Sequence, residues 1–138
     1  CGYTPFDGAE YDYYTTTKGV LEKVKAHVGD VDFAVQPEIL SLLSSGNFGR
    51  YADEKGEMKV CFISNNDITG GNSGSAMFNS KGELLGLAFD GNWEAMGSDI
   101  LYEPKMQRTI GVDVRYILFM IEKYGKAGNL IQELNILN

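Results

Sequence analysis

The stretch that decides the fold runs from Thr69 to Asp90 and reads TGGNSGSAMFNSKGELLGLAFD. Its second half predicts a β-hairpin, with a strand over Ser75–Asn79, a turn at Ser80–Gly82 and a second strand over Glu83–Asp90. The first half holds three glycines and an asparagine, residue types that tolerate the positive φ angles of tight loops. We therefore expect a glycine-rich loop that leads directly into the hairpin.

Further strands are expected on both sides of this hairpin. The run Met58–Ser64 predicts a strand, and the turn-rich residues Asn65–Gly71 connect it to the hairpin. Arg108–Val112 predicts the last strand, and residues 3–17, which are rich in Tyr and Thr, predict a loop followed by a strand. The centre of the chain is therefore expected to be a β structure.

Helices are expected at the periphery of this β structure. Apolar residues recur at helical spacing over Lys18–Val28, and Pro37–Gly46 has proline at the first helical position and glycine at its end. A strongly amphipathic pattern covers Val114–Tyr124, and a further apolar helical face follows Asn129. We expect a single unit over residues 1–138, mainly β with peripheral helices, built as a small barrel or sandwich.

Composition excludes several classes of function. Twelve basic and nineteen acidic residues give a net charge of −7 without any Lys/Arg-rich cluster, so nucleic acid is not an expected partner. The longest apolar run, Tyr116–Ile121, is far too short for a membrane span. Two cysteines and one histidine do not suffice for a structural zinc site, so no metal or cofactor is expected. Cys1 and Cys61 are expected to be free thiols, although a single bridge between them is the alternative.

Ser73 is the strongest candidate for a catalytic residue. It lies between glycines, and a serine nucleophile needs such a loop because its Oγ must project while backbone N–H groups bind the oxyanion. The N–H groups of Gly71 and Ser73 are the expected oxyanion donors. The alternative is a plain Gly/Ser/Asn turn. A G-x-S-x-G elbow is excluded because Ser75 replaces its last glycine, and a phosphate-binding loop is excluded because no lysine follows the glycines.

A family resemblance makes this reading more specific. The segment Gly71–Ser75 (GNSGS) resembles the catalytic-serine loop of chymotrypsin-like peptidases. Residues 67–75 (DITGGNSGS) and 81–94 (KGELLGLAFDGNWE) look like the C-terminal part of the bacterial dipeptidyl-peptidases 7 and 11. The resemblance implies the second, C-terminal barrel half of a chymotrypsin-like double β-barrel, ending in an α-helix. It also implies release of dipeptides from the free N-terminus of peptides, in the periplasm or at the surface of a Gram-negative bacterium.

The same resemblance implies a substrate-binding role for Asp90, Gly91 and Asn92. These residues follow Ser73 at the distance where a chymotrypsin-like barrel places one wall of the pocket for the residue before the cleaved bond. Gly91 implies an open apolar pocket of the dipeptidyl-peptidase 7 type, whereas an arginine there would favour acidic side chains. Asp90 is expected to bind the α-amino group of the substrate. The alternative for Asp90 and Gly91 is a turn at the end of a strand. Trp93 is expected to pack beside the pocket.

The triad is incomplete in this sequence. A serine peptidase needs a histidine and an aspartate, and the only histidine, His27, lies on a helical face where a surface role is expected. Because the chain opens on Cys1, we expect a processed product or a fragment. The family resemblance implies that its partner is the remainder of the same polypeptide, with the histidine and aspartate in a first barrel. A homodimer of the whole enzyme is also expected. The alternative is a non-catalytic binding or regulatory module in which Ser73 is only a turn residue.

Overall fold

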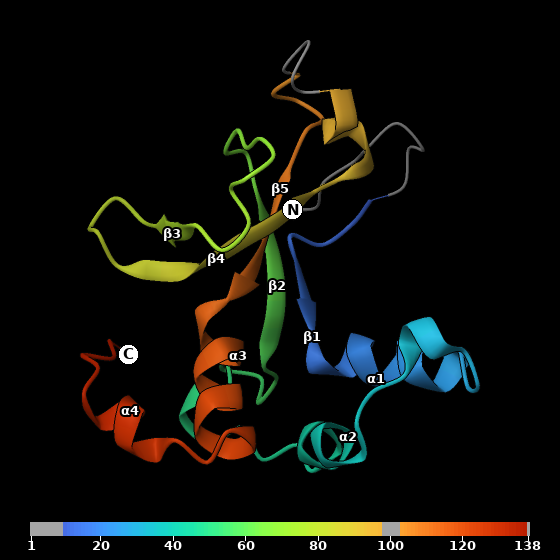
Figure 1. Ribbon diagram of the computed structural model, residues 1–138, viewed down its shortest axis with the longest axis vertical. Helices are drawn as coiled ribbons and strands as arrows, with labels where there is room; N and C mark the ends of the chain where they lie inside the picture. Colours follow the sequence, from blue (N-terminus) through green and yellow to red (C-terminus); the bar gives the residue numbers. More distant parts are fainter. Residues whose placement is uncertain (1–9, 98–102, 138) are drawn as a thin grey trace. The chain divides into compact units, whose positions relative to one another are not determined.

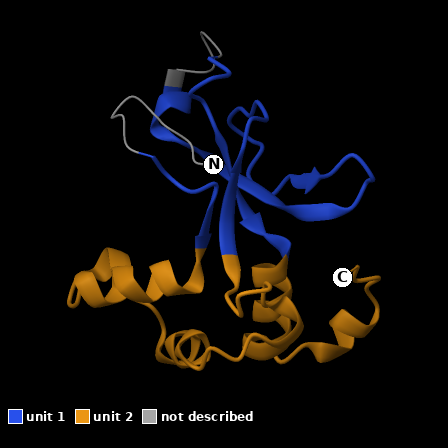
Figure 2. Cartoon of the chain, turned by 180° about the vertical axis from the view of Figure 1, so that it is seen from behind, with its two compact units in different colours: residues 1–15, 60–114 blue, residues 16–59, 115–138 orange. Residues whose placement is uncertain are grey.

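The computed structural model describes residues 10–97 and 103–137 (Figure 1). The chain divides into two compact units, shown in separate colours in Figure 2. Unit 1 comprises residues 1–15 and 60–114, and unit 2 comprises residues 16–59 and 115–138. Unit 1 carries most of the sheet, and most of the helices belong to unit 2.

The sheet has five strands in the order β1-β2-β5-β4-β3. The strands are β1 (Tyr14–Thr16), β2 (Lys59–Ser64), β3 (Ala76–Phe78), β4 (Leu84–Gly91) and β5 (Thr109–Asp113). The pairs β2–β5, β3–β4 and β4–β5 are antiparallel. The hairpin and the strands expected on both sides of it are therefore confirmed.

Glycines allow the central strands to approach closely. A Cβ atom added at Gly86 on β4 would lie 2.0 Å from the carbonyl oxygen of Val112 on β5. A Cβ atom at Gly111 would lie 2.7 Å from Sδ of Met77 and 2.9 Å from the ring of Phe62. Gly86 therefore excludes any side chain while β4 and β5 keep this packing, and a side chain at Gly111 would displace Met77 and Phe62.

The hairpin turn is fixed by one asparagine. Oδ1 of Asn79 accepts hydrogen bonds from the N–H groups of Lys81 and Glu83, at 2.9 and 3.0 Å. The expected turn over residues 80–82 is confirmed, and Gly82 adopts a φ of 78° within it. This Asx-type turn sets the register between β3 and β4.

Unit 2 is built from short helices around an apolar core. They are α1 (Thr17–Ala26), η1 (Val31–Phe33), α2 (Pro37–Ser44), η2 (Gly49–Tyr51), α3 (Val114–Phe119), the π-helical turn η4 (Met120–Tyr124) and α4 (Gly128–Gln132). The core consists of buried side chains from several of these segments: Leu43, Phe48, Tyr51, Met58 and Phe119. The rings of Phe48 and Tyr51 both meet Phe119 edge-on, at centroid distances of 5.8 and 6.0 Å.

The four expected helices are confirmed, with one modification. The helix expected over Val114–Tyr124 begins as α3 and changes to the wider π geometry of η4 before it ends at Gly125. The fold class, β structure with peripheral helices and a C-terminal α-helix, is also confirmed. Cys61 is a free thiol on β2 whose pKa is raised by burial, and Cys1 lies outside the described residues. Within the described ranges, no helix has the length and apolar character of a membrane span.

Candidate functional site

The loop that carries Ser73 is held in shape by its own backbone and by β4. Oδ1 of Asn72 accepts a hydrogen bond from the N–H of Thr69 at 2.8 Å. The N–H of Gly74 donates to the carbonyl of Ala88 at 2.7 Å, and the N–H of Ala88 donates to the carbonyl of Ser75 at 2.9 Å. These bonds tie the residues on both sides of Ser73 to fixed points in unit 1.

Glycine is required at two positions in this loop. Gly71 and Gly74 adopt φ angles of 97° and 87°, in the left-handed region that other residues rarely occupy. The glycines on both sides of Ser73 therefore have a conformational reason, as the sequence pattern predicts.

Ser73 itself is exposed and only weakly bonded. Its Oγ lies 3.4 Å from the carbonyl oxygen of Phe89, a long distance for a hydrogen bond. Among the described residues, the N–H groups of Gly71 and Ser73 enter no hydrogen bond, whereas those of Asn72, Gly74 and Ser75 do. One hydroxyl and two backbone donors are thus accessible on a single loop.

Ser73 lies at a cavity of about 260 Å³ in unit 1. Three segments line this cavity: the serine loop, the end of β4 with the residue after it, and the 3₁₀-helix η3 (Trp93–Gly97). The lining residues are Ile68, Thr69, Gly70, Ser73, Phe89, Asp90, Gly91, Asn92, Ala95 and Met96. The structure therefore brings Ser73, Asp90, Gly91 and Asn92 together at one cavity, and Gly71 lies in the same loop.

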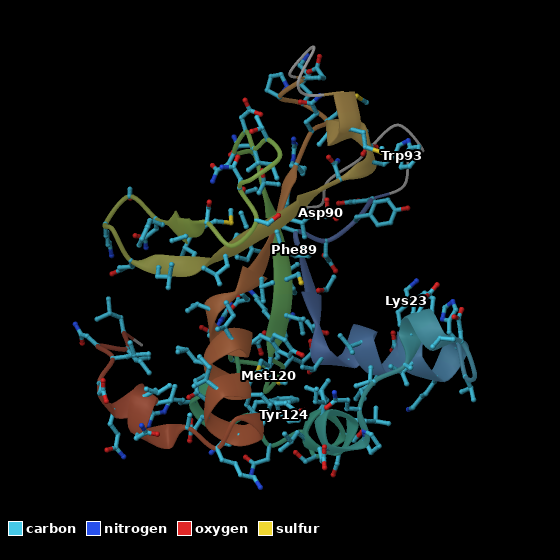
Figure 3. All side chains as sticks on the ribbon, in the orientation of Figure 1. Lys23, Phe89, Asp90, Trp93, Met120 and Tyr124 are labelled. Atoms are coloured by element: carbon cyan, nitrogen blue, oxygen red, sulfur yellow. The ribbon has the colours of Figure 1, made fainter. Side chains whose placement is uncertain are left out.

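A β-bulge places Phe89 and Asp90. Ala88 pairs with Gly111 and Asp90 pairs with Ile110, so Phe89 is an extra residue in β4. Figure 3 labels Phe89 and Asp90 on this strand. Both side chains are exposed, and Oδ1 of Asp90 accepts a hydrogen bond from the N–H of Gly91 at 2.8 Å. The bulge thus turns this end of β4 toward the cavity with its carboxylate accessible.

Gly91 faces η3 closely. A Cβ atom added at Gly91 would lie 2.9 Å from Cβ of Ala95, whereas its next neighbour, the carbonyl oxygen of Arg108, would be 3.7 Å away. The φ angle of Gly91 is not in the left-handed region, so space rather than backbone conformation favours glycine here. A larger side chain at this position therefore requires η3 to move.

Asn92 lines the cavity, but its side-chain amide is engaged with the frame of the cavity. Nδ2 donates to the carbonyl of Met106 and to Oε2 of Glu94, both at 2.8 Å. Oδ1 accepts a hydrogen bond from the N–H of Arg108 at 2.8 Å. The residue that the family resemblance assigns to substrate binding is thus also a structural link between η3 and the segment before β5.

Three features of the site are not predictable from motifs. Ile68, Ala95 and Met96 line the cavity, yet no local pattern distinguishes them from other apolar residues. The helix η3 carries two of them and was not expected. Trp93, labelled in Figure 3 at the start of η3, is 82% exposed and is not a lining residue, so the expectation that it packs beside the pocket is wrong for this chain.

His27 is occupied elsewhere, in unit 2. Its Nδ1 lies 2.9 Å from the carbonyl oxygen of Lys23, and its ring stacks on Phe33 at a centroid distance of 4.0 Å. These contacts agree with the surface role that the sequence predicts. Among the described residues, no group of three His, Cys, Asp or Glu side chains is arranged to hold a metal ion.

Comparisons with known proteins place this geometry in context. Residues 1–136 match the family described as Peptidase S46. The chain is 61% identical over 135 residues to a dipeptidyl-peptidase 7 of Porphyromonas endodontalis, covering 98% of this chain and 16% of that protein. It is 45% identical to an Asp/Glu-specific dipeptidyl-peptidase of Porphyromonas gingivalis, covering 98% of this chain and 18% of that protein.

A solved structure matches the fold as well. The crystal structure of Porphyromonas endodontalis DPP11 in complex with the dipeptide Arg-Glu superposes with a TM-score of 0.88 at 43% identity. The match covers 96% of this chain and 19% of that chain. The chain thus spans less than a fifth of the length of each of these relatives.

Proposed function

This chain belongs to the peptidase S46 family, and from that premise we propose that it is the nucleophile-bearing part of a serine-type dipeptidyl peptidase. The observation that carries the proposal is the position of Ser73. Its hydroxyl is exposed, lies on a loop shaped by two left-handed glycines, and faces a cavity that is also lined by Asp90 and Gly91. A surface turn without a catalytic role does not require a serine hydroxyl that faces a cavity, so this combination favours the catalytic role.

In the proposed reaction, Oγ of Ser73 attacks the carbonyl carbon of the second peptide bond of the substrate and gives its proton to a base. The N–H groups of Gly71 and Ser73 stabilise the oxyanion of the tetrahedral intermediate. The intermediate expels the amine, which takes the proton from the base, and leaves a dipeptidyl ester on Ser73. Water then hydrolyses this ester and releases the dipeptide.

The base comes from outside this chain. His27 contacts Lys23 and Phe33 in unit 2, and the sequence holds no other histidine. Since the chain covers 16–19% of its dipeptidyl-peptidase relatives, we assign the histidine and its aspartate to the remainder of a longer polypeptide. Removing one member of such a triad lowers turnover by about a million-fold, so the longer polypeptide is the active unit.

The residues that line the cavity favour a substrate with an apolar side chain before the cleaved bond and a free N-terminal ammonium group. Gly91 places no side chain in the cavity, and Ile68, Ala95 and Met96 give the cavity apolar walls, so an apolar side chain before the cleaved bond is preferred. The exposed carboxylate of Asp90 at the same cavity is suited to bind the free ammonium group of the substrate. That pairing limits the enzyme to removing two residues at a time.

The test is release of dipeptides by the longer polypeptide. Peptides with a free N-terminus and Leu at the second position should be cleaved, whereas the same peptides with an acetylated N-terminus should not. Ser73→Ala should abolish cleavage, and Ser80→Ala, an exposed hairpin-turn serine that does not line the cavity, should retain it. Equal activity of Ser73→Ala and the unmodified protein would favour the non-catalytic module.

A further inference from the structure

We propose that Asn92 is a positioning residue, which holds η3 in place and thereby sets the wall of the cavity opposite Gly91. This inference rests on the proposed function and deepens it. It assigns Asn92 to the selection of the substrate side chain through Ala95 and Met96, rather than to direct binding of the substrate.

The hydrogen bonds of Asn92 connect three segments that come together at one end of the cavity. Its backbone N–H donates to the carbonyl of Arg108 at 2.9 Å, and its Oδ1 accepts from the N–H of the same residue at 2.8 Å. Its Nδ2 donates to the carbonyl of Met106 and to the carboxylate of Glu94 in η3. Both amide hydrogens and the amide oxygen are thus used by the protein itself.

The same residue also supports η3 through its main chain. The N–H of Ala95 donates to the carbonyl oxygen of Asn92 at 2.9 Å. Ala95 lies where the first carbon of a side chain at Gly91 would be only 2.9 Å away. Ala95 therefore packs directly against Gly91, and the contacts of Asn92 hold Ala95 and Met96 in position as the η3 wall of the cavity.

The serine loop is held by contacts other than those of Asn92. Asn72 shapes the loop through Thr69, and Ala88 holds the backbone of Gly74 and Ser75. None of these bonds involves Asn92. Loss of the Asn92 side chain should therefore loosen η3 and leave the reactivity of Ser73 intact.

Unit 1 contains a matched control. Asn79 makes the same kind of contacts in the β3–β4 turn, since its Oδ1 accepts from the N–H groups of Lys81 and Glu83 and its Nδ2 donates to the Glu83 carboxylate. Asn79 does not line the cavity. Asn79→Ala and Asn92→Ala thus remove comparable hydrogen bonds from a turn, and only the second is next to η3.

The experiment measures kcat/KM of the longer polypeptide for two substrates that differ only in the residue before the cleaved bond, Leu or Ala. Asn92→Ala should lower the preference for Leu over Ala on the order of tenfold, because the Leu side chain depends on the apolar wall and the Ala side chain does not. Asn92→Asp keeps the acceptor for Arg108 but places a carboxylate oxygen against the Met106 carbonyl and the Glu94 carboxylate, so it should lower the preference at least as much. Asn79→Ala should leave the preference unchanged.

Two results would overturn the proposal. An equal loss of kcat/KM for the Leu and Ala substrates would mean that Asn92 binds the substrate directly, and an unchanged preference in both Asn92 variants would mean that η3 does not depend on it. A small fluorophosphonate should modify Ser73 at the same rate in Asn92→Ala and Asn79→Ala.

Hydrogen exchange separates failure of this inference from failure of the proposed function. The amide of Ala95 should exchange faster in Asn92→Ala than in Asn79→Ala, whether or not the protein is a peptidase. If dipeptide release is absent in the unmodified protein, the proposed function is wrong. If exchange at Ala95 is the same in both variants, the positioning role is wrong.

Discussion

Asp90 is a residue whose local role and proposed substrate role can be separated by one substitution. Its Oδ1 accepts the N–H of Gly91, a bond that an asparagine oxygen can also accept. Asp90→Asn therefore keeps the turn and removes the charge. A charge-assisted bond to the substrate ammonium contributes about 1.5 to 3 kcal/mol, so kcat/KM for peptides with a free N-terminus should fall by about ten- to a hundredfold.

The control for this prediction is a label that carries no amine. Modification of Ser73 by a small fluorophosphonate should hardly change in Asp90→Asn, and Asp67→Asn, an exposed carboxylate outside the lining of this cavity, should change neither assay. Equal losses in both assays together with a lower melting temperature would identify Asp90 as a turn residue only.

Tyr51 and Glu122 form a residue pair that makes the stability of the protein depend on pH. Tyr51 is buried in the core of unit 2 and its hydroxyl donates to the Glu122 carboxylate. Burial, followed by this bond, raises the pKa of Tyr51 from 10.0 to about 12. Hydrogen bonds from Lys123 and Tyr51 hold the pKa of Glu122 below its usual value.

The raised pKa of Tyr51 and the lowered pKa of Glu122 make the free energy of unfolding depend on pH. The contribution of Tyr51 to stability is complete below pH 10 and is lost as the pH rises from 10 toward 12, whereas that of Glu122 is lost as the pH falls below the usual range of a glutamate. Tyr51→Phe should lower the free energy of unfolding by about 1 kcal/mol at pH 7 and should reduce the loss between pH 10 and 12. Urea unfolding, followed by circular dichroism at several pH values, measures the free energy of unfolding at pH 7 and its loss between pH 10 and 12. If Tyr51→Phe loses as much stability between pH 10 and 12 as the unmodified protein, the role assigned to Tyr51 is wrong.

Among the described glycines, Gly86 on β4 has the shortest distance from an added Cβ atom to a neighbour, and that neighbour lies on β5. A Cβ atom at Gly86 would lie 2.0 Å from the backbone oxygen of Val112, which has no rotatable side chain to move away. Gly86→Ala should therefore destabilise unit 1 by about 3 kcal/mol. Gly70→Ala is the control, because nothing lies within 4 Å of its added carbon and its φ is not left-handed. Thermal unfolding should show a clearly lower melting temperature for Gly86→Ala and little change for Gly70→Ala.

The elements differ in how far their sequence determines them. The hairpin and helices α1 and α2 were predictable because apolar spacing, the turn residues Ser80–Gly82 and Pro37 are local signals. The helix η3 was not predictable, since its residues show no apolar periodicity and its position depends on the contacts of Asn92 with Met106 and Arg108. The bulge at Phe89 likewise depends on pairing with β5.

For the molecule as a whole, motif and family resemblance predicted the chemistry of the site, and the structure adds the residues that line its cavity. Ser73, Asp90, Gly91 and Asn92 line one cavity, and their roles in catalysis and substrate binding stay predictions. Ile68, Ala95 and Met96 could not be predicted, because an apolar side chain becomes a pocket wall only through tertiary packing. The second role of Asn92 was also missed, since its partners lie 14 and 16 residues away in the sequence.

The proposal predicts that residues 1–138 by themselves release dipeptides at a negligible rate. His27, the one histidine of the sequence, is engaged with Lys23 and Phe33, and the proposal assigns the base to the longer polypeptide. His27→Ala in the longer polypeptide should therefore leave turnover unchanged. Turnover by the isolated chain on the order of 10 per second, a usual rate for an enzyme, would contradict this prediction.

The central claim is that Ser73 is the nucleophile of a larger catalytic unit. Its most direct test is to treat the longer polypeptide with a fluorophosphonate and to locate the adduct by peptide mass spectrometry, with Ser73→Ala and Ser80→Ala in parallel. We predict a single active-site adduct on Ser73, loss of dipeptide release in step with labelling, and no adduct in Ser73→Ala. An adduct on another serine, or dipeptide release that persists when Ser73 is fully labelled, would contradict the account.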